Sequence, residues 1–86
     1  MTGTDDWSGK TVLIVGGSGG IGRATAQEFA DAGASIAIAD INTENLPSHY
    51  LAIKSDITKV SDCAGMISKT VGRFGRLDLI VNAAGV

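Results

Sequence analysis

Several residue types are scarce in this sequence of 86 residues, and each shortage excludes a class of protein. The chain has one cysteine, Cys63, so no disulfide can form within it. We interpret this thiol as a small core residue, because unpaired cysteines are commonly buried and no base lies near it in sequence. The one histidine, His49, has no second ligand in view, which favours a surface or loop residue over a catalyst or metal ligand.

An excess of charge and a long apolar run are also missing. Seven basic and nine acidic side chains are scattered along the chain and give a net charge of -2, so no basic stripe is available to neutralise phosphates. No apolar run approaches the roughly 20 residues that span a bilayer, and the polar start differs from a signal peptide. We therefore expect a cytoplasmic protein that binds neither nucleic acid nor membrane.

The residues that are present predict a single globular core built from alternating strands and helices. Apolar residues make up 44% of the chain, which is enough for one core at this length. The β-branched run Thr11–Val15 predicts a strand buried on both faces. A helix is predicted over Ile21–Ala32, ending at Gly33, and a second buried strand over Ser35–Asp40. Two strands joined through one helix form a right-handed βαβ unit.

The second half of the chain continues this alternation. The polar segment 41–50 contains Pro47 and predicts a loop or a single helical turn. A weak third strand over Leu51–Lys54 precedes a helix that starts at Thr58 or Lys59 and ends at Gly75. A fourth strand is predicted over Leu77–Val81, followed by a loop. The helix should pack on the sheet through an apolar stripe at spacings of three and four, made by Val60, Cys63, Ala64, Ile67, Val71 and Phe74.

A glycine-rich segment lies between the first strand and the first helix. Bare backbone N–H groups and the positive end of a helix dipole attract phosphate at such a position. The glycines fit two overlapping spacings, GxGxxG from Gly17 and GxxxGxG from Gly16, and do not choose between them. Arg23 and Ala24 follow Gly22 where a triphosphate-binding loop would need Lys and then Ser or Thr, which excludes that class. A flexible turn that binds nothing remains the alternative.

Asp40 ends the second strand at close to the spacing of about 20 residues from the last glycine that is expected of a ribose-binding acid. Its carboxylate would accept from the adenosine ribose hydroxyls and would repel a 2'-phosphate, and neither Ile41 nor Asn42 could receive that phosphate. These residues therefore favour NAD over NADP as the cofactor. The alternative is that Asp40 is an ordinary solvated charge at a strand end.

These motifs together resemble the short-chain dehydrogenase/reductase family over nearly the whole chain. The family has TGxxxGIG after its first strand, Asp and a small apolar residue after its third, and NNAG after its fourth. This sequence has VGGSGGIG, Asp56 with Ile57, and NAAG in the same order. Two departures are Val15 in place of the usual Thr and Ala83 in place of the second Asn. The segment 41–50 is also shorter than the helix that is usual there.

The resemblance implies a role for each matching residue. One group would surround the cofactor pyrophosphate, and Asp40 with Ile41 would hold the adenosine ribose. Asp56 and Ile57 would face the adenine, with the carboxylate accepting from the exocyclic amine. The last segment would line the floor near the nicotinamide ribose. The pyrophosphate group is Gly16, Ser18, Gly19, Gly20, Ile21 and Gly22, and the floor is Asn82, Ala83, Ala84 and Gly85.

The resemblance also implies what the chain lacks. The family's catalytic Ser, Tyr and Lys come after NAAG. Tyr50 has Lys54 four residues later, but it lies before the predicted third strand, on the adenine side, and is interpreted as structural. We expect residues 1–86 to be the N-terminal part of one NAD-binding Rossmann-type domain, truncated after its fourth strand and without catalytic residues. The fold expected is α/β in three layers, with a parallel sheet in the order 3-2-1-4 and the ligand at its carboxyl end.

Two alternatives to the enzyme follow from the same residues. The complete protein would transfer hydride between NAD and a small alcohol or carbonyl substrate, and this chain alone would be inactive. In the first alternative, the chain as it stands is a non-catalytic nucleotide-binding fragment. In the second, it is a structural βα module without a ligand. An uncovered strand at Leu77–Val81 also predicts self-association into a homo-oligomer.

Overall fold

The structure is a computed structural model, and it describes residues 6–83. Four parallel strands form one sheet in the order β3-β2-β1-β4. The strands are β1 (Thr11–Val15), β2 (Ser35–Asp40), β3 (Leu51–Lys54) and β4 (Leu79–Asn82). This order confirms the predicted sheet, and the first three strands have the predicted bounds.

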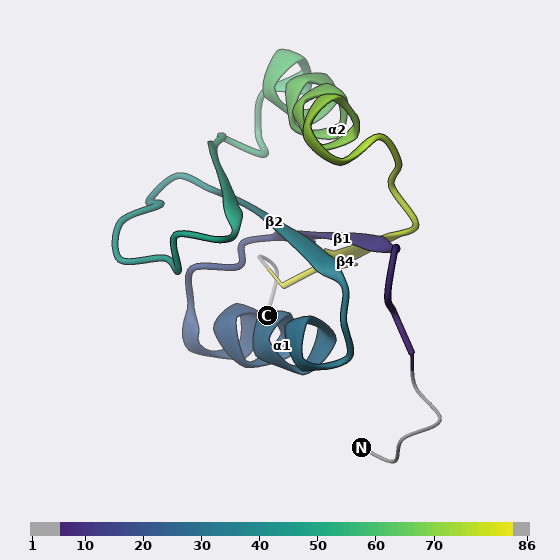
Figure 1. Cartoon of the computed structure of the whole chain (residues 1–86). Coiled ribbons are helices and arrows are strands. Elements are labelled where there is room, and N and C mark those ends of the chain that lie inside the picture. The colour runs from purple at the N-terminus through teal and green to yellow at the C-terminus, as the bar shows by residue number, and fades with distance from the viewer. Residues whose placement is uncertain (1–5, 84–86) are drawn as a thin grey trace.

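Two helices cover opposite faces of the sheet, which gives three layers (Figure 1). They are α1 (Gly20–Asp31), which joins β1 to β2, and α2 (Val60–Phe74), which joins β3 to β4. Gly33 and Gly75, the predicted helix ends, both have positive φ. The segment 41–50 contains neither helix nor strand, as predicted. The arrangement is therefore the Rossmann-type α/β fold that the sequence predicted.

The centre of the core is the pair β1 and β2. Every residue of β1 is buried, as are the four central residues of β2. Because side chains alternate along a strand, Ile14 and Ile38 pack on the α1 side, whereas Leu13 and Ala37 pack on the α2 side. Burial on both faces explains why these two strands are continuous apolar runs.

The predicted apolar stripe of α2 is largely wrong. Val60 is 86% exposed, Ile67 43% and Val71 40%, and Ala64 is exposed as well. The residues that pack on the sheet are buried Met66 and Thr70, with half-buried Cys63 and Phe74 beside them. The helix carries two neighbouring rows at helical spacing, and periodicity alone cannot say which row faces the sheet.

Thr70 explains why the buried row was overlooked. Its side chain is fully buried, but its hydroxyl donates to the carbonyl oxygen of Met66 at 2.7 Å. A hydroxyl that bonds back to the preceding turn can be buried without an unsatisfied polar group. A polar residue therefore occupies a core position that an apolar pattern does not mark.

The fourth strand begins and ends later than predicted. Asp78 lies just before β4, where its carboxylate accepts from the backbone N–H of Thr11 at 2.8 Å and pairs with Arg76 at 2.6 Å. The backbone N–H of Asp78 also donates to the carbonyl oxygen of Thr11 at 3.0 Å, and β4 itself runs from Leu79 to Asn82. Asn82 is thus the last residue of a strand, opposite Val15 in the register, and does not belong to the loop.

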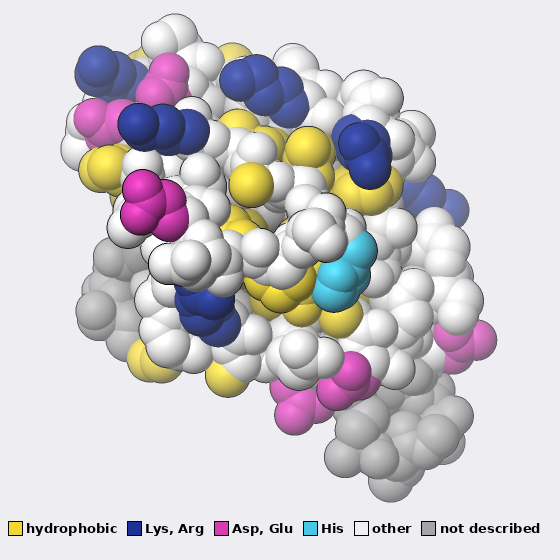
Figure 2. Space-filling view, turned by 60° about the vertical axis from the view of Figure 1, so that its left-hand side comes forward, with side chains coloured by type: hydrophobic (Ala, Val, Ile, Leu, Met, Phe, Trp, Pro, Cys, Tyr) yellow, Lys and Arg dark blue, Asp and Glu magenta, His cyan; other side chains and the backbone are white. Residues whose placement is uncertain are grey.

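The residues that the sequence marked as structural have ordinary surroundings. Tyr50 is buried beside β1 and β2, with its ring centroid 4.6 Å from that of exposed His49. Cys63 lies at the edge of the core and is half-buried. No helix within residues 6–83 is long and apolar enough to cross a membrane. On the face shown in Figure 2, Lys and Arg side chains are interspersed with acidic and apolar ones.

Candidate functional site

The candidate site lies at the carboxyl end of the sheet, where β1 gives way to the glycine-rich loop. Gly16 directly follows β1 and has a φ of +77°, in the region that side chains rarely adopt. Its backbone N–H donates to the carbonyl oxygen of Ala39 in β2 at 2.7 Å. The chain therefore turns sharply at the top of β1 while staying bound to the neighbouring strand.

Gly22 brings helix α1 directly against this turn. A Cβ at Gly22 would overlap the Cα of Gly17 and would lie 2.8 Å from the carbonyl oxygen of Gly16. The first turn of α1 consequently packs on the loop with no room for a side chain. Gly19, the N-cap, supplies no side-chain hydrogen bond, and Cβ atoms at Gly19 and Gly20 would meet open space. The amino end of α1 thus presents accessible backbone to an anion.

Asp40 connects the end of β2 to the glycine loop. One carboxylate oxygen accepts from the Ser18 hydroxyl at 2.6 Å and from the Ser18 backbone N–H at 3.1 Å. The other oxygen accepts from the backbone N–H of Ile41 at 2.7 Å and of Asn42 at 3.4 Å. The acid that was expected to bind ribose therefore also fixes the loop that was expected to bind pyrophosphate.

These hydrogen bonds keep Asp40 ionised. Partial burial alone would raise the pKa of its carboxyl, but the donors from Ser18, Asn42 and Ile41 outweigh it and lower that pKa below its ordinary value. A carboxylate with a lowered pKa is a permanent acceptor at neutral pH. It can accept from sugar hydroxyls and repels a phosphate.

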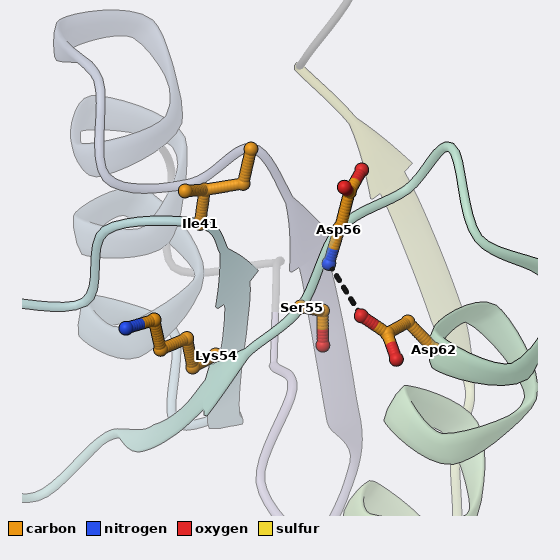
Figure 3. Close-up of a pocket in the computed structure, with 5 residues that line it drawn as sticks. All are labelled: Ile41, Lys54, Ser55, Asp56 and Asp62. Carbon is orange, nitrogen blue, oxygen red and sulfur yellow. Dashed lines mark hydrogen bonds between the residues drawn. The ribbon is translucent and has the colours of Figure 1, made fainter.

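Two cavities lie next to Asp40 at the same edge of the sheet. One, of about 210 Å³, is lined by Gly16, Asp40, Ile41, Ser55 and Ile57. The other, of about 170 Å³, is lined by Ile41, Lys54, Ser55, Asp56 and Asp62 (Figure 3). The two share Ile41, which is 63% exposed, and Ser55, which is buried. Together they offer apolar walls with a few polar groups, which suits a flat, partly polar ligand.

Asp56 is held by its own turn. The Thr58 hydroxyl donates to its carboxylate at 2.6 Å and lowers the pKa of Asp56, and the Thr58 backbone N–H adds a second bond at 3.0 Å. In Figure 3 the Asp56 side chain points away from Asp62, while its backbone N–H donates to the Asp62 carboxylate at 2.8 Å. Both bonds from Thr58 end on the same carboxylate oxygen of Asp56, Oδ1. Asp62 braces this turn from the first turn of α2.

The structure brings most of the expected site residues together. Gly16, Asp40, Ile41 and Ile57 line one cavity, and Asp56 lines its neighbour. The remaining loop residues, Ser18, Gly19, Gly20, Ile21 and Gly22, form the turn and the first turn of α1 above Asp40. Asn82 and Ala83 lie beside β1, and the Ala83 backbone N–H donates to Val15 at 2.8 Å. Ala84 and Gly85 lie outside the described residues.

Three residues at this edge were not assigned to the site from sequence. Ser55 follows β3, and its N–H donates to the Asp40 carbonyl oxygen at 2.8 Å. Asp62 braces Asp56, and Arg23 bonds to the carbonyl oxygens of Ser18, Glu44 and Asn45. Of the three, only Ser55 could have been assigned to the site from sequence, because it directly follows a predicted strand. Arg23 and Asp62 lie on helices. Within residues 6–83 no group of three His, Cys, Asp or Glu could hold a metal ion.

Known proteins with the same arrangement are dehydrogenases and reductases. The chain is 38% identical to a short chain dehydrogenase/reductase of Colletotrichum higginsianum, a match that covers 92% of this chain and 33% of that protein. It is 39% identical to 3beta-hydroxysteroid dehydrogenase 2 of Eggerthella lenta, covering 92% and 34%. The chain thus spans about a third of the length of the curated relatives it matches.

Solved structures agree with the sequence matches. The aldohexose dehydrogenase of Thermoplasma acidophilum superposes with a TM-score of 0.85 at 30% identity, over 95% of this chain and 32% of that one. The 3-ketoacyl-(acyl-carrier-protein) reductase of Brucella melitensis, solved with NADH, gives 0.79 at 28% identity, over 87% and 34%. The short chain dehydrogenase family model matches residues 10–86. The chain therefore belongs to the short-chain dehydrogenase/reductase family and corresponds to its N-terminal part.

Proposed function

We propose that this chain binds NAD along the carboxyl ends of β1, β2 and β3, as the cofactor-binding part of an oxidoreductase that acts on an alcohol or carbonyl substrate. One observation carries the proposal. Asp40 lines a cavity with Gly16, Ile41 and Ile57, and the same carboxylate is hydrogen-bonded to Ser18 in the glycine loop. A ribose acceptor and a pyrophosphate-binding loop are thereby joined at one edge of the sheet.

The residues of this edge fit the adenosine and pyrophosphate parts of a dinucleotide. The open space at Gly19 and Gly20 lets phosphate oxygens reach the backbone N–H groups at the start of α1. Asp40 accepts from ribose hydroxyls, with Ile41 beside the ribose, and Ile57 faces the adenine ring. Asp56 accepts from its exocyclic amine, and Asn82 and Ala83, at the end of β4, line the floor near the nicotinamide ribose. The bound nicotinamide supplies the hydride chemistry, and the chain supplies the position.

NAD is proposed in preference to NADP because of Asp40. Its carboxylate is ionised, and a 2'-phosphate on the ribose would bring like charges together. Calorimetric titration of Asp40→Ala with both cofactors tests this. We expect NAD affinity to fall about tenfold and NADP affinity to fall less, since the repulsion is lost together with the acceptor.

A matched control is Asp31→Ala, which removes the same charge at the opposite end of α1. The Asp31 carboxylate accepts from the exposed Gln27 side chain at 2.7 Å and lines neither cavity of the site, so both affinities should be unchanged. Equal losses of NAD and NADP in Asp40→Ala would refute the ribose assignment. Undetectable binding of either cofactor to the unaltered chain would instead favour a structural module without a ligand.

A non-catalytic nucleotide-binding fragment is the second candidate function. The chain spans about a third of its relatives, and the one tyrosine, Tyr50, is buried in the core. We expect NAD binding by the 86-residue chain without any formation of NADH from added alcohols. The mass of the native product separates the two candidates, because a product of 8.7 kDa supports the fragment and one about three times larger supports the enzyme.

We also propose that the chain self-associates through the outer edge of β4. Within residues 6–83, β4 pairs only with β1, and Ile80 on this strand is 47% exposed. Sedimentation should show oligomers whose population falls on dilution. Ile80→Lys should shift that population toward monomer, whereas Ile21→Lys, the same change at an exposed isoleucine of α1, should not.

A further inference from the structure

Arg23 contacts both the glycine loop and the segment 41–50, as the Asp40 side chain also does. It lies in the first turn of α1, where its Nε donates to the carbonyl oxygen of Ser18 at 2.8 Å. Its two terminal nitrogens donate to the carbonyl oxygens of Asn45 at 3.0 Å and Glu44 at 3.2 Å. The glycine loop and the segment 41–50 are thus joined by one guanidinium.

These contacts close a ring of hydrogen bonds around the acid. Ser18 donates to Asp40, and the Asp40 carboxylate accepts from the Asn42 backbone N–H. The Asn42 side chain accepts from the Glu44 backbone N–H at 2.9 Å, and the Glu44 carbonyl oxygen accepts from Arg23. Arg23 returns the ring to Ser18. The glycine loop, the end of β2 and the segment 41–50 are therefore held in one network.

The chemistry of the ring requires a guanidinium. Three carbonyl oxygens on two separate segments accept from three nitrogens of one planar group, a geometry that the single ammonium of lysine does not reproduce. Within the described part of the chain, the ion pair found is Arg76–Asp78, so Arg23 is bound by carbonyl dipoles and not by a carboxylate. All three of these Arg23 hydrogen bonds therefore end on backbone carbonyl oxygens.

We propose that Arg23 is the positioning residue of the adenosine side of the site, a role that rests on the proposed function. It fixes segment 41–45 against the glycine loop, so that Asp40 and Ile41 keep their places without the helix that a longer segment would provide. Arg23 does not contact the ligand in this proposal. It acts through the carbonyl groups of Ser18, Glu44 and Asn45.

Hydrogen exchange in the ligand-free chain gives the first test. In Arg23→Lys and Arg23→Gln, we expect the ring amides of Ser18, Asn42 and Glu44 to exchange about tenfold faster, while amides of β1 stay as protected as before. The matched controls are Arg73→Lys and Arg73→Gln, which make the same changes at an exposed arginine of α2. Unchanged ring amides, or equal acceleration throughout β1, would overturn the proposal.

Binding of ADP, which carries the adenosine and pyrophosphate groups, gives the second test. Both Arg23 variants should bind ADP about tenfold more weakly, and the Arg73 variants should bind as the unaltered chain does. Added methylguanidinium, well below denaturing concentrations, should restore ADP affinity to Arg23→Ala. If Arg23→Lys bound ADP with unchanged affinity, a positive charge alone would be enough at this position. That result would overturn the role proposed for the planar guanidinium. An unaltered chain that binds no ADP would refute the proposed function, and the exchange experiment would still decide whether Arg23 joins the two segments.

Discussion

The two helices of this small fold differ in the surroundings of an interior glycine and of one row of apolar residues. On α1, Gly22 and Ala26 are buried, and the backbone at Gly22 touches the glycine loop. On α2, a Cβ added at Gly72 would meet no atom within 4 Å, and the row containing Ile67 is exposed. Helix α1 is therefore fitted closely to the backbone of the candidate site, whereas α2 uses one face for the sheet and leaves another uncovered.

This difference separates the part of the molecule that forms the site from the part that supports it. The glycine loop needs a fixed backbone, because an anion is bound by N–H groups whose directions are set by the chain itself. A close approach of α1 supplies that rigidity, with Asp40 and Arg23 fastening the other side. The exposed row of α2 has no part in the site, so substitutions there should leave it unaffected.

The largest expected effect comes from the core beneath the site. Ile38 is fully buried between β1 and α1, so Ile38→Ala should lower the free energy of unfolding by about 3 kcal/mol. Ile67→Ala makes the same truncation on the exposed row of α2 and should cost under about 1 kcal/mol. Urea unfolding at matched concentration measures both. Similar losses would show that the α2 row is buried in solution.

An intermediate effect is expected at the helix glycines. Gly22→Ala should destabilise the chain by about 1 to 3 kcal/mol, because its Cβ would collide with backbone that cannot move aside. Gly72→Ala meets open space and should stabilise the chain by about 1 kcal/mol through helix propensity alone. Thermal melts of the two variants therefore shift in opposite directions. A stabilising Gly22→Ala would contradict the close contact between α1 and the loop.

The smallest effect concerns acid pH. The pKa of Asp40 is lower in the fold than its ordinary value of 3.8, so its contribution to stability is complete above that value and disappears as the pH falls through the folded pKa. Asp40→Asn removes the titration, and its free energy of unfolding should fall less between about pH 6 and about pH 3 than that of the unaltered chain. Asp31→Asn serves as the control and should behave as the unaltered chain. An identical acid response in Asp40→Asn would contradict the lowered pKa.

The fold could be predicted from sequence where one physical signal was decisive. Strands β1 and β2 are apolar on both faces, and glycines mark the ends of both helices, so these elements and their order followed directly. The orientation of α2 did not follow. Val60 and Ile67 carry the stronger apolar signal, but the buried row includes Thr70, whose hydroxyl is satisfied within the helix.

The sequence predicted the motif residues of the candidate site, but not the hydrogen bonds that join the segments carrying them. The positions of Gly16, Gly22 and Asp40 followed from spacing, because a strand end and a helix start fix where they lie. The contacts of Arg23 did not follow, since they depend on how segment 41–50 folds back and no periodic pattern describes that segment. Irregular backbone is specified by individual hydrogen bonds, which sequence periodicity does not record.

The hydrogen bonds of Asp40 have a consequence for how a ligand enters. A carboxylate offers about four lone-pair directions, and here Ser18, Ile41 and Asn42 direct four donors at it. An arriving sugar hydroxyl must exchange with one of them, and the rotatable Ser18 hydroxyl is the donor that can turn away without moving backbone. The net gain at this contact is the difference between two similar bonds, so selectivity among sugars arises here more readily than tight affinity.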